Sequence, residues 1–176
     1  MNLFRLNNDP VIAAQEYQDI HCKKIIVEAA QLLANCYSLD YLKLAPLTQK
    51  GNYRKYSYYN HPISIWVRSS KGNFDWAIKH AIALCEEFEY RFGKKHFCES
   101  FIKWCSENRP DLVLPGEETE QPQCFGSFTD LKVLGNPVEG YKKYYKQAKR
   151  CFFIREKSIQ ASWTRRNIPM WFKINE

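Results

Sequence analysis

The sequence lacks a long apolar run. Hydrophobic residues make up 45% of its 176 residues, but no stretch approaches the roughly 20 apolar residues that a membrane-spanning helix requires. It also lacks the charged-then-apolar opening of a signal peptide, because residues 1–6 lead directly into polar residues. We therefore expect no membrane partner and a cytoplasmic location.

The seven cysteines lack the spacing of a disulfide framework or a zinc site. Their number is odd, no Cys-x-x-Cys pair occurs, and the four histidines are scattered along the chain. Cys22, Cys36, Cys85 and Cys105 fall within helical patterns, where a thiol packs as a small hydrophobic group. We expect free thiols, no metal site and no cofactor.

Acidic residues are scarce in the C-terminal segment, residues 141–176. This segment holds ten Lys or Arg and two acidic residues, whereas the preceding 140 residues hold sixteen and seventeen. Its aromatic residues include Tyr141, Tyr144 and Tyr145. Such a segment could track a phosphate backbone and stack on bases. Alternatively, it forms an amphipathic helix with a solvated basic face and its aromatic rings in the core.

The hydrophobic pattern predicts a mainly α protein, a compact single domain over residues 1–176 with about four helices and long loops. The predicted helices span about 10–36, 73–93, 95–107 and 137–155. Asp9-Pro10 and Asn136-Pro137 are typical helix starts, and Gly93 is a typical helix end. The intervening elements are a short strand or extended segment at 63–67 and long connections at 38–60 and 109–136.

A polar stripe follows one face of the first predicted helix. Tyr17, His21, Lys24, Glu28 and Gln31 are spaced 4, 3, 4 and 3 residues apart. Burying an unbonded polar group costs roughly 2–7 kcal/mol, so the stripe is either a solvated face or the lining of a cleft. In a cleft, Glu28 would act as an acid or base, and His21 would bind a phosphate or tune the carboxylate.

Two further clusters have alternative interpretations. Arg68 and the pair 69–70 precede a predicted helix, where they would bind an anion or simply cap the helix. Residues 90–96 form a helix–glycine–helix junction that includes Arg91 and Lys94. Its cations would bind phosphate or offset the helix dipole.

These residues carry two resemblances. The first is to a set of phage-encoded proteins of uncharacterised function, over nearly the whole chain, and it implies no activity. The matching pattern is Asp19-x-His21-x-x-Lys24, Glu28-x-x-Gln31, Asn60-His61-Pro62, Trp66-Val67-Arg68-x-Ser70, Tyr90-Arg91-x-Gly93-Lys94-x-His96 and Pro169-x-Trp171-Phe172.

The chain also resembles the phage pyrimidine-dimer DNA glycosylases of the endonuclease V type. In that family a short N-terminal arm precedes a helix that bears a histidine and, seven residues later, the catalytic glutamate. His21 and Glu28 have this spacing, and residues 140–148 are similar to the family's aromatic-basic run that contacts damaged DNA. The chain departs from the family at Val27, which replaces an arginine, and in its additional segments 38–60 and 109–136.

This second resemblance implies a DNA repair enzyme, a glycosylase with β-lyase activity on damaged or modified bases in duplex DNA. The family's nucleophile is the α-amino group of a small second residue, uncovered when Met1 is removed. Here that residue is Asn2, which is less readily uncovered. Asn2, His21 and Glu28 are therefore the expected catalytic residues. Nucleic-acid or nucleotide contacts are expected from Lys24, His61, Trp66, Arg68, Tyr90, Arg91, Lys94, His96, Tyr141, Tyr144, Tyr145, Arg165 and Arg166.

Two other functions remain open at this point. A non-catalytic phage protein would enclose and sequester a nucleotide or nucleotide-derived signal, with Arg68, Lys94 and His96 on phosphate and Trp66 or Tyr90 on the base. An interaction protein would instead dock on the host's nucleic-acid machinery through its basic C-terminal segment.

Overall fold

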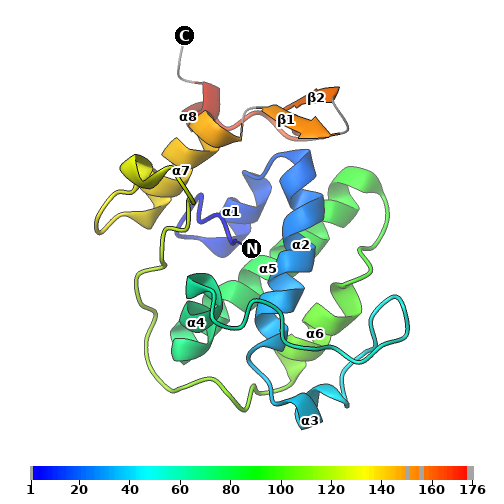
Figure 1. The fold of residues 1–176 in the computed structure, drawn as a ribbon. Helices are drawn as coiled ribbons and strands as arrows, with labels where there is room; N and C mark the ends of the chain where they lie inside the picture. Colours follow the sequence, from blue (N-terminus) through cyan, green and yellow to red (C-terminus); the bar gives the residue numbers. More distant parts are fainter. Residues whose placement is uncertain (1, 150, 155–156, 174–176) are drawn as a thin grey trace.

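A computed structural model describes residues 2–149, 151–154 and 157–173, and it is mainly helical (Figure 1). Its described elements are α1 (Pro10–Gln15), α2 (Asp19–Ala34), α3 (Leu39–Leu42), α4 (Pro62–Ser69), α5 (Lys71–Phe92), α6 (Glu99–Glu107), the 3-10 helix η1 (Thr129–Leu131), α7 (Pro137–Ala148), the strands β1 (Cys151–Ile154) and β2 (Lys157–Gln160), and α8 (Met170–Lys173). The prediction of a mainly helical fold is confirmed, but eight α-helices replace the predicted four. The surplus includes α1, α3 and α8, which are too short to show a helical period in the sequence.

The core lies around α2 and α5. Helices α1 and α2 both pack against α5 (Figure 1), and α5 buries apolar residues along most of its 22 residues. The apolar residues of the N-terminal arm, residues 2–6, belong to the same hydrophobic cluster. The described part of the chain contains no helix with both the length and the apolar content to cross a membrane.

The prediction of one continuous helix over residues 10–36 is wrong, because the chain leaves the helical conformation between α1 and α2. Gln18 is extended, with φ −69° and ψ 158°. The freed carbonyls of Gln15 and Tyr17 accept hydrogen bonds from the buried guanidinium of Arg91, at 2.8 and 2.7 Å. These bonds come from a residue more than 70 positions away, so local patterning could not indicate the break.

The predicted strand at 63–67 is helix α4 instead. Its start is set by His61, whose Nδ1 accepts a hydrogen bond from the Ile63 amide at 3.2 Å, followed by Pro62 at the first helical position. Helix α5 follows directly, with Ser70 as its N-cap, so it begins at Lys71, two residues before the predicted start. Its predicted end is confirmed at Gly93, whose φ of +67° favours glycine.

The later helices are shorter than predicted. Helix α6 begins at Glu99, four residues after the predicted start. Helix α7 begins as predicted, with Asn136 as its N-cap and Pro137 in its first turn, but it ends at Ala148. The prediction of helix up to residue 155 is wrong, since β1 and β2 pair antiparallel with Cys151 opposite Gln160.

The long segment 109–136 contains a strap, residues 116–124, that covers the start of α5. The Gly72 amide donates to the Gly116 carbonyl at 3.0 Å, and the buried Asn73 side chain bonds both the amide and the hydroxyl of Thr119. The strap passes so close that a Cβ on Gly72 would lie 2.1 Å from the Glu118 nitrogen. The far end of the strap reaches the N-terminal arm.

Candidate active site at the N-terminal arm

The N-terminal arm is buried, although it has no regular secondary structure. The Tyr17 hydroxyl accepts a hydrogen bond from the Phe4 amide at 2.7 Å and donates to the Phe4 carbonyl at 2.9 Å. Gln121 of the strap donates from Nε2 to the Leu3 carbonyl at 2.6 Å. Backbone groups of the arm are thus bonded from two sides, which fixes its path across α2.

Asn2 is held through its side chain, and its backbone nitrogen faces Glu28. The carboxamide donates from Nδ2 to the Cys124 carbonyl at 2.7 Å, and its Oδ1 accepts from the Tyr141 hydroxyl at 2.8 Å. The backbone nitrogen donates to Oε2 of Glu28 at 2.6 Å. The short distance places this nitrogen in direct contact with the carboxylate that the sequence indicated as catalytic.

Glu28, the residue that accepts the hydrogen bond from the Asn2 nitrogen, is partly exposed. Its side chain is 16% exposed, and its Oε1 lies 3.9 Å from Nζ of Lys24, which is largely exposed. Lys24 and Glu28 therefore converge as the shared helical face predicted. If Met1 is removed, the Asn2 nitrogen becomes an α-amino group, so this site would pair a nucleophilic amine with a carboxylate able to exchange its proton.

His21 lies in the aromatic core, so it neither belongs to a solvated face nor lines a cleft with Glu28, the two alternatives that the sequence left for the polar stripe. Its Nδ1 is 2.6 Å from the Tyr145 hydroxyl, and its ring is 4.7 Å from that of Phe4. Burial, followed by the charges of Lys149 and Lys24, lowers the pKa of His21 well below its ordinary value. A neutral imidazole in this position supports the N-terminal arm through Phe4 and cannot supply positive charge to a phosphate.

His61 is a half-buried neighbour of the same site. Burial lowers its pKa, and the nearby Glu28 carboxylate acts in the opposite direction. Because Nδ1 accepts from the Ile63 amide, the proton of the neutral ring is on Nε2. His61 is therefore a neutral hydrogen-bond donor within electrostatic range of Glu28.

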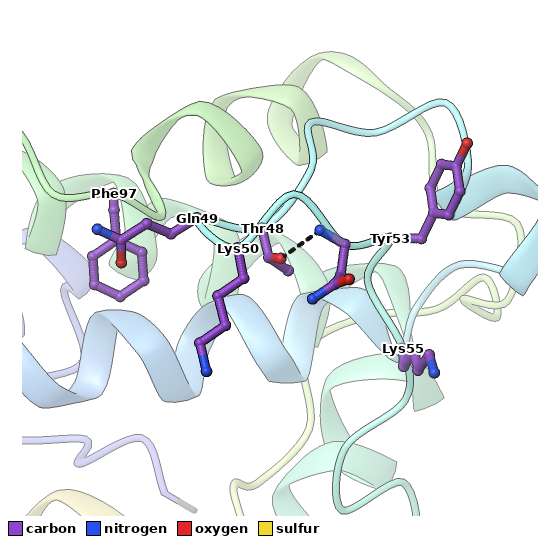
Figure 2. A pocket seen from close by; sticks show the side chains of 7 residues that line it. Thr48, Gln49, Lys50, Tyr53, Lys55 and Phe97 are labelled. Atoms are coloured by element: carbon purple, nitrogen blue, oxygen red, sulfur yellow. Dashed lines mark hydrogen bonds between the residues drawn. The ribbon is translucent and has the colours of Figure 1, made fainter.

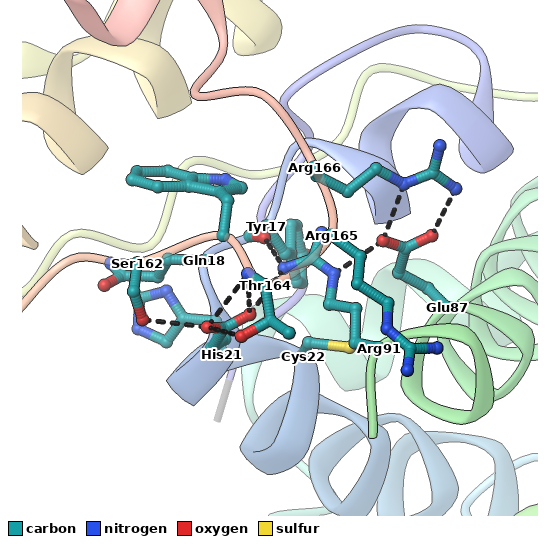
Figure 3. A network of polar contacts seen from close by, with 12 residues as sticks. Tyr17, Gln18, His21, Cys22, Glu87, Arg91, Ser162, Thr164, Arg165 and Arg166 are labelled. Atoms are coloured by element: carbon teal, nitrogen blue, oxygen red, sulfur yellow. Dashed lines mark hydrogen bonds and ion pairs between the residues drawn. The ribbon is translucent and has the colours of Figure 1, made fainter. Parts of the chain in front are cut away.

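Arg91 was expected to contact a nucleic acid. It is instead buried in an ion-pair network, where a nucleic acid cannot reach it. Its Nε donates to Oε1 of Glu87 at 2.5 Å and its Nη1 to Asp19 at 3.0 Å, while Arg166 donates to both carboxylate oxygens of Glu87 (Figure 3). Burial would raise the pKa of Asp19, but hydrogen bonds from Thr164, from Ser162 and from Arg91 lower it below its ordinary value. The network ties α5 to α2 and to the C-terminal segment.

Several expected stacking residues are also internal. Tyr141 and Tyr145 are fully buried, and Trp66 is buried with its Nε1 donating to the Thr119 carbonyl at 3.1 Å. Tyr144 is half-buried and stacks on Phe125, with ring centroids 4.6 Å apart. The amphipathic alternative describes α7 better, since its tyrosines face the core.

The remaining predicted contacts are spread over the molecule. Arg68 donates to the Tyr59 carbonyl at 2.7 Å, and His96 is buried where it accepts from the Cys98 amide. Tyr90 and Arg165 bond each other's carbonyls, and Lys94 is exposed. Capping accounts for the serines near Arg68, because Ser70 caps α5 and Ser69 bonds the Trp66 carbonyl.

Other residues of the site had no signal in the sequence. Gln121 and Cys124 belong to a segment whose composition indicates only a surface loop, yet they hold the N-terminal arm. Lys132 lines the same hollow as Gln121 and Cys124, so a second cation accompanies Lys24 near Asn2. The bonds of Cys124 to Asn2 and of Gln121 to Leu3 join positions more than 100 residues apart, so only the folded chain reveals them.

Comparisons of this chain with protein-family models, curated proteins and solved structures found no match.

Proposed function

We propose that this protein is a DNA glycosylase with β-lyase activity that acts on damaged or modified bases in duplex DNA. The observation that carries the proposal is the 2.6 Å contact between the Asn2 nitrogen and Oε2 of Glu28. An arm buried and bonded along its length would hold an α-amino group at one fixed position, which favours attack by orientation. The family resemblance assigns the nucleophile and the acid–base to these same two residues.

The proposed reaction begins with a mature chain that has lost Met1. The Asn2 amine bonds to C1′ of the nucleotide as the glycosidic bond breaks, and the base leaves with the bonding electrons and takes up a proton. Opening of the sugar gives an imine between Asn2 and C1′. Removal of a C2′ proton then expels the 3′ phosphate by β-elimination, with Glu28 as the group that takes and returns protons.

The positive charges around the site support a polyanionic substrate. Lys24 lies beside Glu28, and Lys132 lies near the strap residue Cys124 that holds Asn2. A backbone phosphate on either side of the reacting nucleotide would meet these cations. His61 adds a neutral donor at the same site.

The nucleotide-binding alternative is not favoured by the positions of its residues. Trp66 and Arg68 lie beside the start of α5, whereas Tyr90, Lys94 and His96 lie at its end. A helix of 22 residues is roughly 33 Å long, far more than one nucleotide spans. These five residues cannot enclose a single ligand.

The test is borohydride trapping on duplexes with and without ultraviolet damage. We expect wild type with a free Asn2 amine to form a covalent adduct with damaged DNA, and acetylated protein to form none. Glu28→Gln keeps the hydrogen-bonding shape but cannot exchange a proton, so strand cleavage should fall by roughly 10²–10⁴-fold. Its DNA affinity and melting temperature should change little.

Lys24→Ala is the matched control at protein concentrations that saturate the DNA, because it removes the ion pair and weakens DNA affinity but leaves the Glu28 carboxylate. Near-normal trapping by this variant would separate proton transfer from the loss of an ion pair. Absence of an adduct from fully processed wild-type protein on every damaged duplex would refute the proposed reaction.

A further inference from the structure

The segment 41–74 contains six Lys or Arg and no acidic residue. Lys43 and Lys71 each pair with an aspartate outside the segment, and Arg68 donates to a backbone carbonyl. Lys50 and Lys55 are exposed and have no ion pair with any residue that the structure describes. Their uncompensated charge lies outside the C-terminal segment that the sequence indicated as basic.

Both lysines belong to a structured loop. The Thr48 amide donates to the Asn52 carbonyl at 2.9 Å, and the Gly51 amide donates to the Thr48 carbonyl at 2.8 Å. Gly51 has a φ of +74°, which the tight turn requires. Beyond the turn, the Arg54 guanidinium stacks on the Phe101 ring at 3.7 Å, and the Asn35 side chain bonds Ser57. The loop thus has a fixed shape on both sides of Lys55.

The loop borders an open groove of about 870 Å³, which we call the loop groove (Figure 2). Its lining includes Lys50, Tyr53 and Lys55 from the loop and Phe97 from the turn before α6. Tyr53 is 58% exposed and Phe97 51% exposed. The ring of His96 stacks under Phe97 with centroids 4.3 Å apart, so one side of Phe97 is supported and the groove holds exposed aromatic surface.

The loop groove continues toward the candidate active site. It adjoins a smaller hollow of about 370 Å³ that shares Lys55 and Phe97 and is also lined by Val27 and Gln31 of α2. Gln31 is three residues beyond Glu28 on the same helix face, a separation of roughly 4.5 Å along the axis. A strand passing Glu28 in this direction would enter the groove.

We propose that the loop groove binds an unpaired DNA strand that flanks the reacting nucleotide. Lys50 and Lys55 contact its phosphates, and bases stack on Phe97 and Tyr53, the combination of cations and aromatic rings that binds single strands without sequence preference. The placement beside the reacting nucleotide rests on the proposed function, whereas the strand binding does not depend on any chemistry.

The experiment measures binding of fluorescent duplexes, either blunt or with a single-stranded overhang on one strand or the other. The protein is the full chain with Glu28→Gln, so that no strand is cut. We expect overhang duplexes to bind more tightly than blunt ones. In the Lys50→Ala/Lys55→Ala variant, the slope of log affinity against log salt for the overhang should fall by roughly 1.4, or about 0.7 for each phosphate contact on a single strand.

Stacking has its own readout. We expect Phe97→Ala to weaken overhang binding by roughly 5- to 100-fold and to remove the quenching of a 2-aminopurine placed in the overhang. Phe97→Leu keeps most of the apolar volume, so it should preserve the melting temperature and still lose the quenching. Lys43→Ala is the matched control, since it removes an exposed lysine of the same segment outside the groove.

Equal affinity for overhang and blunt duplexes, in the Glu28→Gln protein with its groove unchanged, would overturn the proposal. Groove variants that behave like Lys43→Ala would overturn it as well. Borohydride trapping is scored separately, so a loss of the overhang preference refutes the groove alone, and a failure of trapping refutes the glycosylase reaction alone.

Discussion

Asn2 is bonded at both ends of its carboxamide, and these two bonds decide where its backbone nitrogen points. The Cys124 carbonyl and the Tyr141 hydroxyl hold the side chain, and Glu28 receives the nitrogen. A smaller second residue would be uncovered by removal of Met1 more readily, but it would lose this anchorage. If Met1 is removed, the side chain at position 2 would therefore orient the new α-amino group, although a smaller residue there would allow Met1 to be removed more readily.

This view predicts the behaviour of Asn2→Ala. We expect a larger fraction of chains without Met1, and a rate of borohydride trapping per free amine that falls by roughly 100-fold, as a misplaced reacting group typically causes. Mass spectrometry gives the processed fraction and gel analysis gives the adduct. A trapping rate that rises in proportion to processing would mean that the carboxamide does not position the amine.

At the level of elements, the sequence predicted helix boundaries where the cause is local. Gly93 ends α5, and Asn136 with Pro137 starts α7, because backbone conformation and capping depend on neighbouring residues. The break before α2 and the helical state of 63–67 were missed. The first depends on Arg91, and the second depends on a histidine N-cap, which is not among the preferred capping residues.

The strap is the element that joins the start of α5 to the N-terminal arm. Gly72 allows its close approach, and Gln121 and Cys124 carry the contact to the arm. Strap and arm should therefore loosen together.

Gly72→Ala tests this coupling, because the added methyl would lie 2.1 Å from the Glu118 nitrogen. We expect a loss of about 1–3 kcal/mol in the free energy of unfolding and faster hydrogen exchange at the Phe4 amide. Gly51→Ala is the control: its methyl meets nothing within 4 Å, although its φ of +74° also costs stability. Faster exchange at Phe4 in both variants would indicate general destabilisation and no specific coupling.

At the level of the whole molecule, the sequence indicated the pair of Glu28 with the second residue, but only through a family resemblance. The spacing of His21 and Glu28 is visible in the sequence, yet the fold gives the two residues different environments. His21 is in the aromatic core, whereas Glu28 is partly exposed. Helical spacing fixes which residues share a face, but burial depends on what the arm and α7 place over that face.

The distribution of charge is also a property of the folded molecule. Tyr141 and Tyr145 of the C-terminal segment are internal, and Arg166 is taken up by Glu87. Cations near the candidate site come instead from α2 and from the segment before α7, through Lys24 and Lys132. Removing the whole C-terminal end would be a poor test of DNA binding, because Ser162 and Thr164 bond Asp19 in the buried network.

Point substitutions near the site give the sharper prediction for salt dependence. The proposed function gives Lys24 and Lys132 one phosphate contact each. In Lys24→Ala/Lys132→Ala, the slope of log affinity for duplex DNA against log salt should therefore fall by roughly 1.8, about 0.9 per contact. Lys43→Ala should leave the slope unchanged, since Lys43 pairs with Asp40 on α3, away from the N-terminal arm (Figure 1). Fluorescence anisotropy over a series of salt concentrations measures both. Equal slopes for wild type and the double variant would show that phosphates do not reach Lys24 and Lys132, and DNA would then have to approach another face of the molecule, beyond the reach of Glu28.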